Sequence, residues 1–160
     1  MQPLTYPQAL QRMTALCSRA EYCEADIRQK LRTSGLSTDD TDRLIDYLFD
    51  ENYINTPRYA HAFVRDKFRH AQWGRLKIAQ ALRMKRVPES DIRAAMDDEM
   101  ADDDYQALLT QLLAKKAASL HTSQTGLPQE DSNIHARLIR FALSRGFTMD
   151  EALAAAGNLK

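Results

Sequence analysis

Ten lysine and arginine residues lie between positions 58 and 93, where only three acidic residues occur. Such a density of cations can bind the phosphates of a nucleic acid or an acidic groove on another protein. The flanking segments are acidic: residues 1–57 carry six cations and nine acids, and residues 94–160 carry six and ten. The net charge of zero therefore hides a basic block, and such an asymmetry indicates something about partners rather than fold.

The spacing of these cations gathers them on helical faces. Arg58, Arg65 and Arg69 fall within about 40° of one another on a helix of 100° per residue. The next predicted helix adds a second group of five. We expect contacts to phosphates or to an acidic partner, without sequence-specific reading of bases. The candidate DNA-binding or partner-binding residues are Arg58, Arg65, Arg69, Arg75, Lys77, Arg83, Lys85 and Arg86.

Both the basic block as a whole and Trp73 within it can also be interpreted without a role in binding. The block as a whole could be a solvated face that keeps the chain soluble. Trp73, between His70 and Arg75, could stack on a base of single-stranded nucleic acid, or it could pack in the core where two helices meet.

Catalytic chemistry has little support. Carboxylates cluster at 97–99 and 102–104, but acid–base catalysis needs two carboxyls with separated pKa values in a partly dry cleft. Consecutive acids at helix starts instead complement the helix dipole. The sequence has no phosphate-binding glycine loop and no GxSxG motif. Cys17 and Cys23 form no CxxC pair and the four histidines are scattered, so we expect no enzyme, no metal ion and no cofactor.

The elements that must position the basic block are helices. A pattern of an apolar pair four residues apart, a helix stop and a new helix start occurs three times, with stops at Gly35, Arg86 and Gly146. Spacings of this size are typical of stacked supersecondary units. We expect an all-α fold of about nine helices in three tandem three-helix repeats. The repeats are predicted at 1–54, at 55–101, which is the basic one, and at 102–160, with a loop at 121–131.

Local signals mark where the predicted helices begin. Pro7 opens the first helix, Ser37 is the N-cap of the third, and Thr56 is an N-cap followed by Pro57 at the first helical position. Pro88 starts the short helix after the second stop. With no run of about 18 apolar residues and no signal peptide, we expect a cytoplasmic protein that does not enter a membrane.

Four segments carry a resemblance to a known family. Residues 24–31 (EADIRQKL) resemble the phrase E-x-E-L-x-x-K-L, and residues 140–147 (RFALSRGF) resemble R-F-L-x-R-R-G-F. Between them, residues 53–64 (YINTPRYAHAFV) and 73–87 (WGRLKIAQALRMKRV) resemble the two phrases of the middle repeat. Together they are similar to the RecX family, bacterial regulatory proteins that act on the RecA recombinase filament, over about residues 10–156.

The chain departs from the family pattern at loop positions. Cys23 stands where a serine usually caps the second helix, and Arg86 stands where glycine is expected. Asn52 and Thr56 replace an expected glycine and aspartate. Arg86 must take a left-handed conformation or end its helix differently. Its side chain either adds a functional charge to the block or is simply tolerated at a helix end.

The resemblance implies an elongated, curved array of helical repeats that binds along a RecA–single-stranded DNA filament. Family members modulate the recombinase, typically restraining filament growth, ATP hydrolysis and strand exchange, without chemistry of their own. We therefore expect an inhibitor of RecA that acts in homologous recombination, DNA repair and the SOS response. Single-stranded or duplex DNA would bind through phosphates, and the protein would act as a monomer. The alternative is a helical-repeat adaptor for another acidic protein, without DNA binding.

Overall fold

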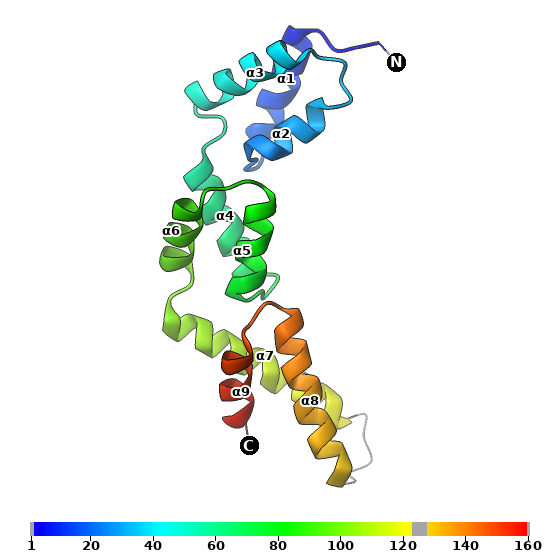
Figure 1. Cartoon of the computed structure of the whole chain (residues 1–160), viewed down its shortest axis with the longest axis vertical. Helices are drawn as coiled ribbons and strands as arrows, with labels where there is room; N and C mark the ends of the chain where they lie inside the picture. The colour runs from blue at the N-terminus through cyan, green and yellow to red at the C-terminus, as the bar shows by residue number, and fades with distance from the viewer. Residues whose placement is uncertain (1, 123–127, 160) are drawn as a thin grey trace. The chain divides into compact units, whose positions relative to one another are not determined.

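The computed structural model describes residues 2–122 and 128–159, without the side chains of Thr122 and residues 128–132. In these ranges the chain forms nine α-helices and no strand (Figure 1). The all-α prediction is therefore confirmed. The helices are α1 (Tyr6–Cys17), α2 (Glu24–Leu31), α3 (Thr38–Asp50), α4 (Thr56–Arg69), α5 (Arg75–Met84), α6 (Glu89–Glu99), α7 (Asp102–Thr122), α8 (Pro128–Ser144) and α9 (Met149–Gly157).

The contacts of the backbone divide the chain into two compact units. The first contains residues 1–63 and 82–93, and the second contains residues 64–81 and 94–160. The division passes through α4, α5 and α6, so each helix of the predicted middle repeat contributes residues to both units. The repeat boundaries expected at 54/55 and 101/102 stay predictions.

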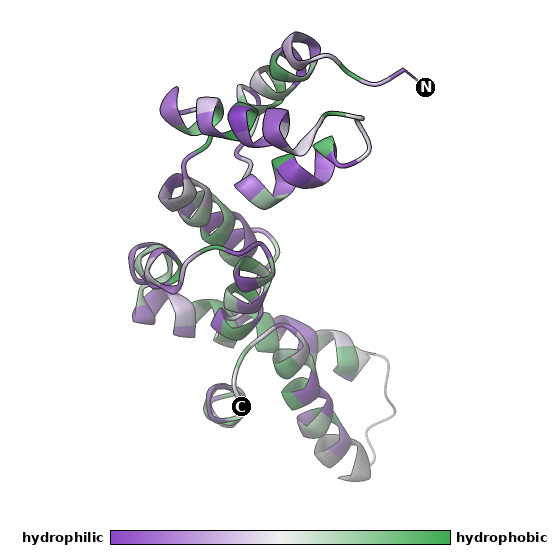
Figure 2. Ribbon diagram, turned by 45° about the horizontal axis from the view of Figure 1, so that its top comes forward, coloured by the Kyte–Doolittle hydropathy of each residue, from purple (hydrophilic) through white to green (hydrophobic). Residues whose placement is uncertain are grey.

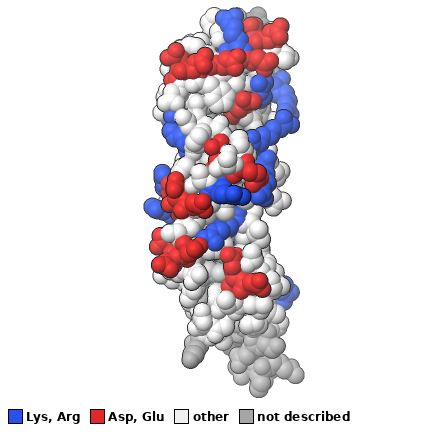
Figure 3. All heavy atoms as spheres, turned by 60° about the vertical axis from the view of Figure 1, so that its left-hand side comes forward, with Lys and Arg blue, Asp and Glu red and all other residues white. Residues whose placement is uncertain are grey.

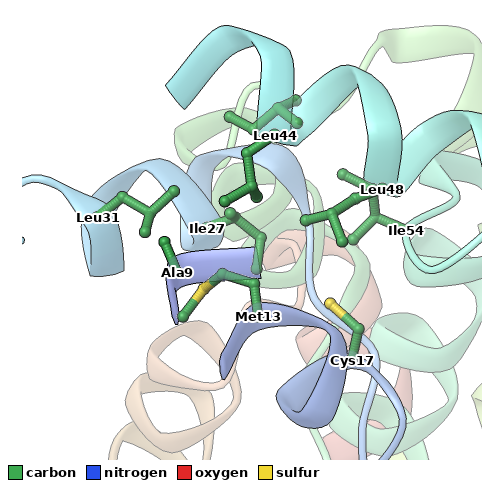
Figure 4. Close-up of a cluster of buried hydrophobic side chains, with 9 residues drawn as sticks. Ala9, Met13, Cys17, Ile27, Leu31, Leu44, Leu48 and Ile54 are labelled. Carbon is green, nitrogen blue, oxygen red and sulfur yellow. The ribbon is translucent and has the colours of Figure 1, made fainter. Parts of the chain in front are cut away.

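The first unit has a core built from the faces of its first three helices. Ala9, Met13 and Cys17 recur every four residues on α1 and are at most 9% exposed. They pack with Ile27 and Leu31 of α2 and with apolar residues of α3 (Figure 4). Figure 2 shows the resulting amphipathic pattern, in which hydrophobic and hydrophilic residues alternate along the helices.

The second unit buries apolar residues of α7, α8 and α9. Leu113 and Phe147 are almost fully buried, and the ring of Phe147 lies 5.2 Å from that of Tyr105, centroid to centroid. Tyr105 in turn lies 6.1 Å from the ring of Phe68. These aromatic contacts join the end of α4 to the last three helices.

Two predicted helix starts have different outcomes. The Ser37 hydroxyl accepts a hydrogen bond from the backbone N–H of Asp40 at 3.1 Å, which confirms Ser37 as an N-cap. Thr56 is not a cap. The Asn55 side chain accepts from the backbone N–H of Arg58 at 2.9 Å, so Asn55 caps α4 and Thr56 is the first helical residue. The N-cap of α4 is therefore Asn55, one residue earlier than predicted.

The recurring helix stops share one backbone conformation. Gly35, Arg86 and Gly146 all have positive φ, at 84°, 62° and 97°. Arg86 therefore takes the left-handed conformation that the family's glycine would adopt freely. In the second and third copies, the residue after the stop donates its N–H five residues back, at 3.1 Å each: Val87 to Leu82 and Phe147 to Ala142.

The loop expected at 121–131 is shorter at both ends than predicted. Helix α7 continues to Thr122, and α8 already begins at Pro128. Pro128 is the first residue of α8, where its missing N–H costs nothing. Residues 123–127 lie outside the described residues.

Candidate partner-binding surfaces

The eight predicted contact residues are shared equally between the two units. The first unit holds Arg58, Arg83, Lys85 and Arg86, and the second holds Arg65, Arg69, Arg75 and Lys77. On the face that Figure 3 shows, blue Lys and Arg atoms lie next to red Asp and Glu atoms rather than forming one uninterrupted basic patch. Each cation must therefore be considered with its own partners.

The guanidinium of Arg58 is occupied by contacts within the fold, which leaves it less available to a binding partner. Its Nε lies 2.8 and 2.6 Å from the two carboxylate oxygens of Glu21. Its terminal nitrogen donates to the backbone carbonyls of Asn52 and Tyr53 at 3.1 and 3.2 Å. With a carboxylate and two carbonyls satisfied, this guanidinium holds the α3–α4 turn in place.

Two further cations of the first unit are also paired. Arg83 donates to the carboxylate of Glu89, and Lys85 donates to Asp26 at the first turn of α2. Both cations are still accessible to solvent: the side chain of Arg83 is 55% exposed and that of Lys85 is 44% exposed. Arg86 is exposed and forms no ion pair with a described residue.

Asp26 connects the paired Lys85 to the N-terminus of α2. Its carboxylate accepts from the backbone N–H of Cys23 at 3.2 Å and is only 16% exposed. Burial by itself would raise the pKa of Asp26, but the hydrogen bonds from Lys85 and Cys23 outweigh it and lower that pKa below its usual value. Burial raises the pKa of the Cys23 thiol, which makes the thiol a poor nucleophile.

A groove in the first unit lies between α2 and the C-terminal turn of α5. It has a volume of about 710 Å³ and is lined by residues from both helices together with Phe49 of α3. Its rim carries Arg86 and also Arg28 and Arg32, which the sequence interpretation did not select. Those two arginines lie in the acidic first third of the chain, so counting charge by segment concealed them.

On α4, two arginines one turn apart differ in their surroundings. Arg65 forms a two-point ion pair with Glu99, with N–O distances of 3.1 and 2.7 Å. Arg69 is exposed and has no ion pair among the described residues. Because Glu99 pairs with Arg65 and offsets its charge, Arg69 is the stronger candidate for a phosphate contact.

Arg75 is held by residues at the start of α7 and just before it. Its terminal nitrogen donates to Asp102 at 2.7 Å and to the Met100 carbonyl at 3.1 Å, while its guanidinium lies 4.0 Å from the ring centre of Tyr105. The Tyr105 hydroxyl accepts from the N–H of Arg75 and donates to Glu151 at 3.1 Å. Burial raises the pKa of Tyr105 far beyond its usual range, so its hydroxyl keeps this proton.

Trp73 lies between two lysines of the second unit. The ammonium groups of Lys67 and Lys77 are 4.9 and 4.5 Å from its ring centre. Lys77 also donates to the Ser144 carbonyl at 3.4 Å. The ring is half-buried rather than sealed in the core. An aromatic ring can stack on a nucleic acid base while nearby ammonium groups bind the phosphate.

Neither a metal-binding cluster nor a membrane-spanning helix is found among the described residues. Within the residues that the structure describes, no three His, Cys, Asp or Glu side chains gather in a way that could hold a metal ion. Among the described helices, none combines the length and the apolar composition needed to cross a bilayer.

Comparison with known proteins places the chain in a family. Residues 57–96 match the family model for RecX, second three-helix domain. Regulatory protein RecX of Vibrio campbellii is 31% identical over 136 residues, which cover 85% of this chain and 81% of the relative. That of Vibrio parahaemolyticus has the same identity and coverage, and that of Acinetobacter baylyi is 29% identical.

Solved structures share the fold. A crystal structure of regulatory protein RecX has a TM-score of 0.81 at 21% identity, over 96% of this chain and 73% of that one. The crystal structure of RecX from Lactobacillus salivarius has a TM-score of 0.78 at 19% identity, over 96% of both chains. These structures share the fold, and the sequence relatives show that the chain belongs to the RecX family of regulatory proteins.

Proposed function

We propose that this protein modulates the RecA recombinase, as an inhibitor, by binding the filament that RecA forms on single-stranded DNA. The observation that carries the proposal is membership of the RecX family over 85% of the chain. Binding would slow ATP hydrolysis, strand exchange and filament growth. The protein would act as a cytoplasmic monomer in recombinational repair and the SOS response.

The surfaces described above support a role in binding. Arg69 and Arg86 are exposed cations without an ion pair to a described residue. Trp73 presents a half-buried ring flanked by ammonium groups. Arg69, Lys77 and Trp73 all belong to the second unit and are its proposed DNA contacts, whereas Arg86 lines the groove of the first unit.

The test is an ATPase assay of the cognate recombinase on single-stranded DNA, with this protein titrated in. We expect hydrolysis to fall as the protein approaches stoichiometric coverage of the filament. A paired measurement of DNA strand exchange should show the same order of potency among variants. Unchanged hydrolysis and strand exchange at saturating protein would refute the proposal.

A helical-repeat adaptor that does not bind DNA is the second candidate. One observation favours it: five of the eight candidate cations, Arg58, Arg65, Arg75, Arg83 and Lys85, are ion-paired to carboxylates of the same chain. Such pairs leave fewer charges for phosphates. Retention of single-stranded DNA that weakens steeply with salt supports the first candidate, and absence of retention at low salt supports the second.

A further inference from the structure

The groove of the first unit has an apolar wall that is exposed to solvent. Met84, the last residue of α5, is 78% exposed, and Phe49 of α3 is 36% exposed. Both line the same groove of about 710 Å³. A flexible thioether beside an aromatic ring adapts to apolar side chains of different shapes. Exposed apolar residues that share a groove are more informative than the same residues scattered singly.

The charges around this wall are unbalanced. Arg28 is held by Glu24 at 3.2 Å and by Asp42 at 2.9 Å. Lys85 is held by Asp26. Arg32 and Arg86 are exposed and form no ion pair with a described residue. Two guanidinium groups therefore remain beside the apolar wall, each able to bind a carboxylate through two parallel hydrogen bonds.

The backbone conformation at one of these two residues is unusual for arginine. The positive φ of Arg86, 62°, follows the last turn of α5, which closes with the hydrogen bond from Val87 to Leu82. This conformation costs a non-glycine residue free energy. Arginine nevertheless occupies the position and is one of the residues that line the groove.

We propose that this groove binds an acidic segment of a protein partner that also carries one large apolar side chain. The apolar side chain packs against Met84 and Phe49, and carboxylates on either side pair with Arg32 and Arg86. A nucleic acid backbone matches this surface less well, because it offers phosphates without an aliphatic side chain to cover the exposed thioether. This inference rests on the proposed function, in which the partner is the cognate recombinase.

Photocrosslinking on the assembled filament tests the groove directly. Met84 is replaced by p-benzoylphenylalanine in the full chain, which is then bound to the recombinase filament on single-stranded DNA and irradiated. We expect a crosslink to a recombinase segment rich in aspartate and glutamate, identified by mass spectrometry. Leu76, 55% exposed and near the opposite end of α5, is the matched control position. It should not crosslink to that segment.

Charge and apolar variants provide the second measurement. Arg32→Gln with Arg86→Gln, and separately Met84→Gln, should each weaken binding to the recombinase several-fold. Arg12→Gln, an exposed arginine of α1 outside the groove, and Leu76→Gln are the controls and should bind as the unchanged protein does. Circular dichroism should show the same helical content for all variants, since every changed side chain is exposed.

The outcomes separate the groove from the proposed function. A crosslink from position 84 to DNA, or to a recombinase segment without acidic residues, overturns the acidic-segment assignment. No crosslink, together with unchanged binding of the groove variants, also overturns it while ATPase inhibition persists. If inhibition itself is absent in the unchanged protein, the proposed function fails, and the crosslink to an acidic segment is then not expected either.

Discussion

Gly74 meets Gly146 backbone to backbone, where the N-terminus of α5 contacts the turn between α8 and α9. The N–H of Gly74 donates to the carbonyl of Arg145 at 2.6 Å, and the N–H of Leu76 donates to the carbonyl of Gly146 at 3.1 Å. The first N–H groups of a helix have no partner within it. The turn supplies these acceptors, and only residues without a side chain allow the two backbones to approach this closely.

Replacing Gly146 by alanine should therefore destabilise the second unit. A Cβ at this position would lie 2.7 Å from the backbone nitrogen of Lys77, and its φ of 97° disfavours any side chain. We expect a loss of about 2–4 kcal/mol in the free energy of unfolding. Urea denaturation followed by the fluorescence of Trp73, the single tryptophan, measures it.

Gly157→Ala is the matched control. Gly157 ends α9, and a Cβ there would meet nothing within 4 Å. The free energy of unfolding should change by no more than about 0.5 kcal/mol. Equal effects of the two substitutions would contradict the close backbone contact.

Much of the helical fold could be predicted because its signals are local. Gly146 ends its helix as expected, and Ser37 caps α3 through a residue three positions away, whereas α2 already ends at Leu31, before Gly35. Gly74 shows the limit of such reasoning. Its tight packing depends on Gly146, which is distant in the sequence, so no local pattern around Gly74 could reveal it.

The candidate site was predictable only in part for the same reason. Helical spacing placed Arg65 and Arg69 on one face, but the acid that pairs with Arg65 is Glu99, which lies outside the basic block. Lys85 is likewise paired with Asp26 from the first acidic segment. Segment-wise charge counting treats such acids as separate from the block, although folding brings them into it.

Arg86→Gly should make the protein more stable while weakening its partner binding. Glycine adopts the φ of 62° without the steric cost that arginine bears, so we expect a gain of about 1 kcal/mol in the free energy of unfolding. Chemical denaturation measures the gain, and binding to the recombinase filament measures the loss. Arg86→Gln should lose the same binding without gaining stability. Unchanged binding in both variants would mean that Arg86 is only tolerated at the helix end.

Asp26→Asn should destabilise the first unit in a pH-dependent way. Because the folded state lowers the pKa of Asp26, its ionised form adds stability above the ordinary value of about 3.9. That stability is lost as the pH falls through the lowered pKa. We expect a deficit of about 1–2 kcal/mol at pH 7 that begins to shrink as the pH falls below about 3.9 and is lost only below the lowered pKa.

Asp42→Asn is the control for that measurement. Like Asp26, Asp42 forms an ion pair, with Arg28 at 2.9 Å, but the side chain of Asp42 is 52% exposed. Exposed ion pairs contribute little, so its removal should change the free energy of unfolding by no more than about 0.5 kcal/mol at either pH. Urea denaturation at pH 7 and at pH 3 compares the two variants. A deficit for Asp26→Asn that persists undiminished at pH 3 would contradict a role for its charge.

Arg69→Gln should reduce the salt dependence of single-stranded DNA binding more than Arg65→Gln does. Each unneutralised cation that contacts a phosphate contributes about one unit to the slope of log affinity against log salt. Arg69 is exposed without an ion pair to a described residue, so its loss should remove about one unit. Arg65 is held at 2.7 Å by Glu99, and its loss should remove less than half as much. Quenching of Trp73 fluorescence by an oligothymidylate at several salt concentrations measures both slopes. A larger reduction for Arg65→Gln would show that Glu99 releases its partner to the DNA, contrary to the pairing that distinguishes these two arginines.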